Sequence, residues 1–177
     1  MAELRRTVRI FLAEDNPADA FLLKEALESH GIEHEIDRCV DGEDCVGRLT
    51  KEAATLQPDL IIVDLNLPRV DGLEVLKTVR AKSEFDGVPV MVLTSSQSPR
   101  DRQNAYDFGA DAFVSKPPRL DDFLEIVGRS VSSMLQGSRR NPGALCRGHN
   151  AKQTLVGGSK APRGGRTFAR IAQSSSY

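Results

Sequence analysis

The sequence contains no long run of apolar residues. A membrane-spanning helix needs roughly 20 consecutive, mostly apolar residues, and no stretch of this chain approaches that length. The short apolar stretch near the amino terminus is followed almost at once by Glu14 and Asp15, whereas a secretory signal would continue apolar. We therefore expect neither a membrane span nor a signal peptide.

Cysteine is also scarce. The chain has three cysteines, Cys39, Cys45 and Cys146. Their number is odd, and their spacing fits no zinc-binding pattern. We therefore expect free thiols in a reducing compartment, which predicts a cytoplasmic protein.

Acidic residues are missing from the last part of the chain. Residues 137–177 carry eight Lys and Arg and no Asp or Glu, whereas residues 1–136 hold the other 16 basic residues and all 25 acidic ones, a net charge of −9. The basic segment is rich in Gly, Ser and Arg and has no sustained apolar periodicity, so it cannot bury enough surface to offset its chain entropy. We predict a folded domain over 1–136 and a disordered basic tail over 137–177.

Three roles for this tail remain open. It can be a solubilising segment, it can bind polyanions nonspecifically, or it can fold back onto the acidic body. It has neither aromatic interleaving nor a recognisable nucleic-acid-binding pattern, so we do not expect a nucleic-acid partner.

Short apolar runs alternate with amphipathic stretches over the first 136 residues. The runs predict strands at 7–13, 35–40, 60–64, 88–94 and 112–115. The stretches predict a helix from Pro17 to just before Gly31 and further helices at 41–52, 72–81, 100–108 and 120–135. This strict alternation predicts an α/β fold, namely a doubly wound five-stranded parallel sheet with helices on both faces. In such sheets ligands bind beyond the carboxyl ends of the strands.

Polar residues stand at the carboxyl ends of four of the predicted strands. They are Glu14 and Asp15 at the first strand, Asp64 at the third, Thr94 at the fourth and Lys116 at the fifth. Three carboxylates in one crevice repel one another unless a cation sits among them, and a hard ion such as Mg²⁺ prefers oxygen ligands. A carboxylate can also act as a nucleophile that forms an acyl phosphate, with a metal ion and an ammonium group stabilising the developing charge.

The motifs at these strand ends carry a family resemblance. They are LAEDN at 12–16, VDLNLP at 63–68 with DG at 71–72, VLTS at 92–95 and GADAFVSKP at 109–117. Together, over roughly residues 7–135, they resemble response-regulator receiver domains. The resemblance implies a flavodoxin-like fold of the kind found in chemotaxis regulators. The runs at 14–20 and 93–96 look most like single-domain regulators that are paired with phytochrome-type histidine kinases.

The resemblance assigns roles by position. Asp64 is then the phosphoacceptor. Mg²⁺ would be held by Glu14, Asp15, Asp64 and the main-chain carbonyl of Asn66. Lys116 would bind the phosphoryl group and Thr94 would move toward it, so that Phe113, the switch aromatic, could swing inward. The bond between Lys116 and Pro117 is usually cis in this family.

The implied function is a stand-alone response regulator, because the chain leaves no room for a folded output domain. It would accept a phosphoryl group from a histidine kinase or a phosphotransfer protein, with only slow autodephosphorylation and no enzymatic turnover.

The face formed by the fourth helix, fifth strand and fifth helix would bind a partner or a second copy; we expect it to include Arg102, Ala105, Tyr106, Phe113 and Ile126. The alternatives are a transcriptional regulator whose tail contacts DNA and a phosphohydrolase. The latter usually carries a second carboxylate where this chain has Asn66.

Overall fold

The computed structural model describes residues 6–140, with side chains through residue 137. Five parallel strands form one sheet in the order β2-β1-β3-β4-β5. The strands are β1 (Val8–Ala13), β2 (His34–Cys39), β3 (Leu60–Val63), β4 (Val90–Thr94) and β5 (Ala112–Ser115). Because the order reverses between β1 and β3, the crevice for a ligand lies at the carboxyl ends of these two strands.

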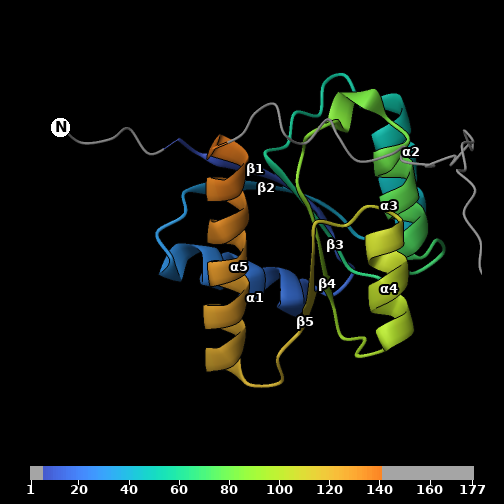
Figure 1. The fold of residues 1–177 in the computed structure, drawn as a ribbon. Helices are drawn as coiled ribbons and strands as arrows, with labels where there is room; N and C mark the ends of the chain where they lie inside the picture. Colours follow the sequence, from blue (N-terminus) through green and yellow to red (C-terminus); the bar gives the residue numbers. More distant parts are fainter. Residues whose placement is uncertain (1–5, 141–177) are drawn as a thin grey trace, which may run out of the picture. The chain divides into compact units, whose positions relative to one another are not determined.

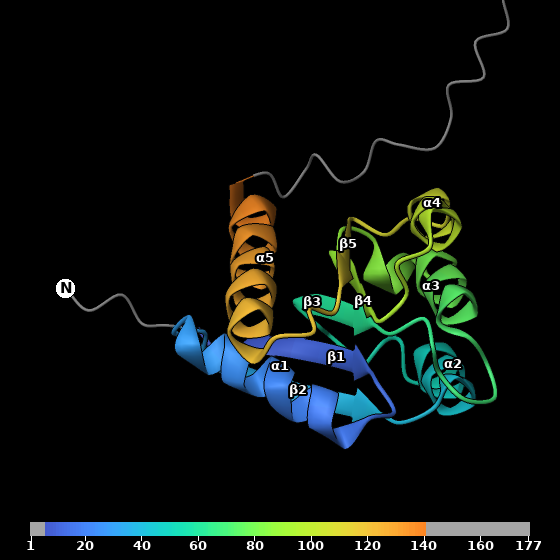
Figure 2. The ribbon, with the colours of Figure 1, turned by 90° about the horizontal axis from the view of Figure 1, so that it is seen from below.

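Helices cover both faces of the sheet. They are α1 (Pro17–Ser29), α2 (Gly42–Lys51), α3 (Gly72–Arg80), α4 (Pro99–Asp107) and α5 (Leu120–Arg140), with a 3-10 turn, η1, at Ser83–Phe85. Figures 1 and 2 show α1 and α5 on one face and α2, α3 and α4 on the other. The predicted doubly wound α/β fold is therefore confirmed.

The start of helix α1 sits at the same sheet edge as the end of β1. The side chain of Asn16 caps this helix by accepting a hydrogen bond from the Ala18 N–H at 2.9 Å, and Pro17 occupies the first helical position. Proline costs nothing there because its missing N–H would have no helical partner. The connection from Ala13 to Pro17 is therefore short, and it holds Glu14 and Asp15 at the edge of the sheet.

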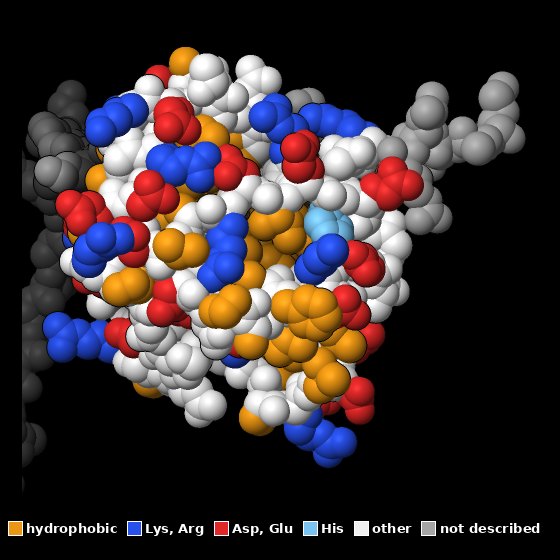
Figure 3. All heavy atoms as spheres, turned by 180° about the vertical axis from the view of Figure 1, so that it is seen from behind, with side chains coloured by type: hydrophobic (Ala, Val, Ile, Leu, Met, Phe, Trp, Pro, Cys, Tyr) orange, Lys and Arg blue, Asp and Glu red, His pale blue; other side chains and the backbone are white. Residues whose placement is uncertain are grey.

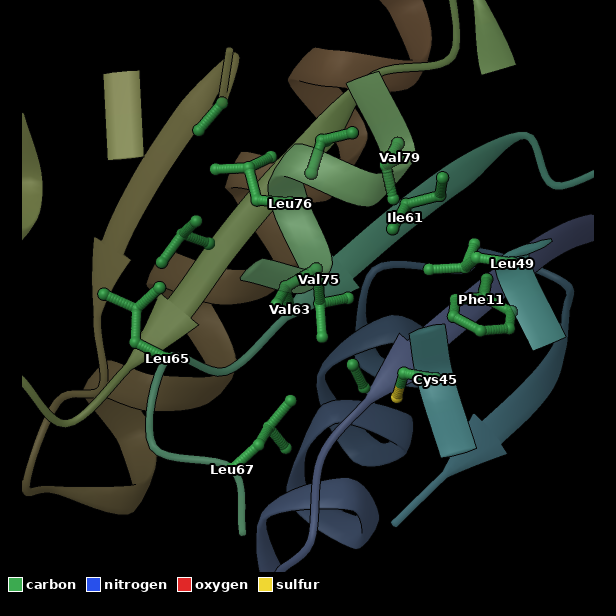
Figure 4. Packing of buried hydrophobic residues seen from close by; sticks show 14 of the residues in the cluster. Phe11, Cys45, Leu49, Ile61, Val63, Leu65, Leu67, Val75, Leu76 and Val79 are labelled. Carbon is green, nitrogen blue, oxygen red and sulfur yellow. The ribbon is translucent and has the colours of Figure 1, made fainter. Parts of the chain in front are cut away.

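The core lies in two layers, one on each face. Every residue of β3 is fully buried, as expected for a central parallel strand. On one face Ile61 packs against Leu76 and Val79 of α3, as Figure 4 shows. Burial of each such side chain stabilises the fold by roughly 1.5–3 kcal/mol, so the sheet is a rigid support for the loops at its edge.

The helix and strand boundaries differ from the predicted ones by at most two residues, except at the end of α5. That helix runs to Arg140, five residues beyond the predicted end at Leu135. Its first turns pack on the sheet through Phe123, Val127 and Val131, which recur at helical spacing. The remainder of the predicted basic tail, 141–177, lies outside the described residues, as does Cys146.

The expectation of free thiols is wrong for two of the cysteines. Cys39 ends β2 and Cys45 lies in the first turns of α2, and the structure joins them in a disulfide. The tight connection between strand and helix brings their Cα atoms to 5.7 Å, which is within the range that a disulfide requires. Both cysteines are buried.

The surface of the described part mixes both signs of charge. Figure 3 shows Lys and Arg interspersed with Asp and Glu on the face seen from behind, around an apolar patch. The large apolar side chains that remain exposed are Phe21, Val40, Tyr106, Leu120 and Ile126. Within residues 6–140 the helices are all too short or too polar to cross a membrane.

Candidate phosphoacceptor and metal site

The ammonium group of Lys116 lies at the centre of the site. Its Nζ donates to Asp64 Oδ2 at 2.6 Å, to Asp19 Oδ2 at 2.7 Å and to Glu14 Oε2 at 2.8 Å. The strand ends of β1, β3 and β5 supply Glu14, Asp64 and Lys116, and the first turn of α1 supplies Asp19. Residues separated by up to 102 positions in the chain thus share one cluster.

Burial and the neighbouring charges have opposite effects on the pKa values of the groups in this cluster. The side chains of Glu14 and Asp64 are only 3% and 5% exposed. Burial raises the pKa of Glu14 above its ordinary value, and the Lys116 ammonium only partly offsets that effect. Burial alone would lower the pKa of Lys116, but its hydrogen bonds to Asp19, Asp64 and Glu14 outweigh burial and raise that pKa. Lys116 is therefore a fixed positive charge at neutral pH.

Three carboxylates are placed to share a cation. Glu14, Asp15 and Asp64 each offer a carboxylate oxygen, and these oxygens lie within 4.8 Å of one another. Asp15 is exposed, whereas the other two are buried. A partly open set of oxygen ligands suits a hard divalent cation that keeps some of its water. The donor set therefore fits a divalent metal ion beside Asp64.

The loop after β3 closes the other side of the site. The Asn66 N–H donates to Asp64 Oδ1 at 2.9 Å, and its side-chain amide donates to Thr94 Oγ1 at 3.3 Å and Ser95 Oγ at 3.0 Å. Thr94 is fully buried, and its hydroxyl also accepts from the Ser96 N–H. The hydroxyl is therefore linked to Asp64 through Asn66 and is not a direct partner of the carboxylate in this structure.

Two further residues hold the backbone of the site, Arg38, which the sequence did not single out, and Gly72 of the DG motif. Arg38 on β2 donates to the carbonyls of Glu14 and Asp15 at 2.8 and 2.7 Å. Gly72, at the start of α3, is packed so closely that a Cβ there would lie 2.0 Å from the carbonyl oxygen of Asp64. The DG motif thus lets α3 rest directly on the backbone of Asp64.

Phe113 lies apart from the carboxylates. Its ring is buried in the core layer under α4, and the guanidinium of Arg102 lies 4.9 Å from the ring centroid. The expected inward swing of this ring on phosphorylation stays a prediction. Ala105 is also fully buried. Of the expected contact face, Arg102, Tyr106 and Ile126 are exposed, and Ala105 and Phe113 are not available to a partner.

The expectation of a cis bond before Pro117 is also wrong. The described residues contain no cis peptide bond. The trans form is the lower in energy, by about 0.5–1 kcal/mol for a bond to proline, and in that form the backbone N–H of Lys116 donates to the Thr94 carbonyl at 2.7 Å. Lys116 reaches all three carboxylates from this position.

Comparison with known proteins shows the family of this chain. Residues 10–128 match the model of the response regulator receiver domain. The chain belongs to this family, whose members are signalling proteins of two-component systems rather than classical enzymes.

Individual relatives include response regulators that this chain covers over most of their length. The response regulator Rcp1 of Synechocystis sp. is 33% identical over 121 residues, which cover 67% of this chain and 82% of Rcp1. The crystal structure of the phosphorylated cyanobacterial phytochrome response regulator RcpA superimposes with a TM-score of 0.68 at 33% identity, covering 75% of this chain and 96% of RcpA. The Mn²⁺-bound form of Rcp1 gives a TM-score of 0.66 at 32% identity, with 73% and 95% covered.

Transcriptional regulators are also among the relatives. KdpE of Escherichia coli, the transcriptional regulator of the KDP operon, is 39% identical over 108 residues. These residues cover 61% of this chain but only 44% of KdpE. The likeness to KdpE is therefore confined to less than half of that protein.

Proposed function

We propose that this protein is a stand-alone response regulator that accepts a phosphoryl group on Asp64 and signals by protein contact. The observation that carries the proposal is the 2.6 Å contact between Lys116 Nζ and Asp64 Oδ2, beside the carboxylates of Glu14 and Asp15. Asp64 thus sits between a fixed cation and carboxylates that can hold a metal ion, which suits a carboxylate that receives a phosphoryl group.

The transfer is a displacement at phosphorus. An oxygen of Asp64 forms a bond to the phosphorus, the bond from phosphorus to the donor breaks, and its electron pair leaves with the donor. Lys116 neutralises charge on the phosphoryl oxygens, and the hydroxyl of Thr94 donates to one of them. Glu14, Asp15 and Asp64, together with the Asn66 carbonyl, would hold Mg²⁺, which offsets the remaining negative charge.

A sensor histidine kinase, or a phosphotransfer protein, is the proposed donor. The similar protein RcpA is a phytochrome response regulator, which supports a phytochrome-type kinase for this chain as well.

We propose that the exposed residues Arg102, Tyr106 and Ile126 mark the face for a downstream partner or a second copy. A regulator that contacts DNA through its basic tail is the second candidate, favoured by the eight Lys and Arg of residues 137–177.

The phosphoacceptor can be tested with a small donor. Incubation with acetyl phosphate and Mg²⁺ is expected to add one phosphoryl group to the wild type and none to Asp64→Asn, because the amide oxygen is a poor nucleophile. Intact-mass spectrometry measures the labelled fraction. Asp37→Asn is the matched control, since Asp37 pairs with Arg48 outside the site and should leave labelling unchanged. Undiminished labelling of Asp64→Asn would refute the assignment.

The metal ligands can be tested at Asp15. Its side chain is exposed, so Asp15→Asn should keep the melting temperature in metal-free buffer. We expect it to weaken Mg²⁺ binding by about tenfold or more and to suppress labelling by acetyl phosphate at low Mg²⁺. A titration of melting temperature against Mg²⁺ measures the binding, and Glu28→Gln, a change of the same charge at an exposed position of α1, serves as control. Equal Mg²⁺ affinity in wild type and Asp15→Asn would exclude Asp15 as a ligand.

A further inference from the structure

All three N–H donors of Lys116 are engaged. A lysine ammonium has three donors and no acceptor, and each donor here meets a different carboxylate, on Glu14, Asp19 and Asp64. A phosphoryl oxygen that arrives at Asp64 therefore finds no free donor on this side. Before Lys116 can bind the phosphoryl group, one of its three bonds has to break.

The exposure of the three carboxylates decides which bond breaks. Glu14 and Asp64 are 3% and 5% exposed, whereas the side chain of Asp19 is 25% exposed. A buried carboxylate that loses its cation cannot regain water, and this costs several kcal/mol. Asp19 can be rehydrated where it stands. The bond between Lys116 and Asp19 is therefore the least costly of the three to give up.

We propose that Asp19 is a positioning residue that holds Lys116 in the resting state and releases it when the phosphoryl group arrives. The inference rests on the proposed phosphorylation of Asp64. As the bond from Asp64 to phosphorus forms and the bond from phosphorus to the donor breaks, Lys116 exchanges its N–H bond to Asp19 for one to a phosphoryl oxygen. No proton or electron is transferred by this exchange, and when acetyl phosphate is the donor, its phosphoryl group passes to Asp64 and acetate is the leaving group. Asp19 thereby slows phosphorylation and stabilises the unphosphorylated state.

The substitution Asp19→Asn tests the exchange in the full chain. Asparagine keeps the size of the side chain and one acceptor oxygen, but it replaces a charge-assisted hydrogen bond by a weaker neutral one. With acetyl phosphate below saturation and Mg²⁺ in excess, we expect the rate of labelling to rise roughly three- to tenfold. The affinity for beryllofluoride, which mimics the acyl phosphate without chemistry, should rise by a similar factor.

The control removes the same charge from the same helix. Glu25→Gln lies further along α1 and should change both quantities by less than about twofold, since screening weakens a charge that is not in contact. A purely structural role of Asp19 would change the melting temperature without raising both quantities. If the wild type is labelled and Asp19→Asn is labelled no faster, the role of Asp19 is wrong. If the wild type itself takes no phosphoryl group on Asp64, the proposed function fails, and this inference fails with it.

Discussion

Replacement of Lys116 by methionine is expected to lower the free energy of unfolding by about 3 kcal/mol at pH 8 in the presence of a chelator. Removal of one partner from a buried ionic cluster leaves uncompensated charge, and losses of about 3–5 kcal/mol are typical. The lower end applies here because Asp19 can regain water. Glu14 and Asp64 cannot, and their mutual repulsion is no longer screened by the ammonium.

The same variant should have a characteristic pH dependence. Burial and the charge of Asp64 raise the pKa of Glu14, while Lys116 lowers it, so loss of Lys116 raises this pKa further. The folded state then binds a proton more tightly than the unfolded state does, and stability falls as the pH rises from the ordinary Glu value through the folded one. The defect of Lys116→Met should therefore be smaller at pH 5 than at pH 8.

Urea unfolding at the two pH values measures this difference. Lys24→Met is the control, because Lys24 pairs with Glu28 on an exposed helix surface and should change stability by no more than about 0.5 kcal/mol. Mg²⁺ should restore part of the lost stability in Lys116→Met by replacing the missing cation. A variant as stable as the wild type at pH 8 without metal would mean that the cluster does not depend on Lys116.

Gly72→Ala is expected to be the most damaging single-methyl change at the site. The added carbon would lie 2.0 Å from the Asp64 carbonyl oxygen and 2.7 Å from the Leu65 Cα, both of them backbone atoms that cannot rotate away. Either α3 or the segment that carries Asp64 must shift. We expect a loss of about 2–3 kcal/mol, in the range for overpacking, and slower labelling of Asp64 in the protein that remains folded.

Gly47→Ala provides the matched comparison. Gly47 lies within α2, and a Cβ there would meet nothing within 4 Å. Alanine should stabilise that helix by up to about 1 kcal/mol, without any effect on labelling. If the contact at Gly72 is as close as the structure indicates, the melting temperature falls in Gly72→Ala and rises in Gly47→Ala, and acetyl phosphate labelling slows only in Gly72→Ala. Equal stability of Gly72→Ala and wild type would contradict it.

The fold could be predicted from the sequence because its signals are local. Apolar runs such as 60–63 mark buried parallel strands, and Asn16 and Pro17 mark the start of a helix. The carboxyl ends of parallel strands share one edge, so the polar residues Glu14, Asp64 and Lys116 could be placed together before any coordinates were known.

Other features depend on geometry that the sequence does not encode locally. Asp19 is an acid in the first turn of a helix, which the helix dipole explains without any site, so nothing in its position signals the contact with Lys116. The disulfide depends on how β2 meets α2. The contact of Arg102 with the ring of Phe113 depends on how α4 lies beside β5.

The separation of the cluster residues along the chain has a consequence for biosynthesis. The contact between Glu14 and Lys116 spans 102 positions. Such a contact forms only after the intervening chain has closed into a long loop. A growing chain that still lacks β5 has the carboxylates but not the ammonium that balances them. Competence for phosphorylation should therefore arise in a single step, late in synthesis, once the last strand has joined the sheet.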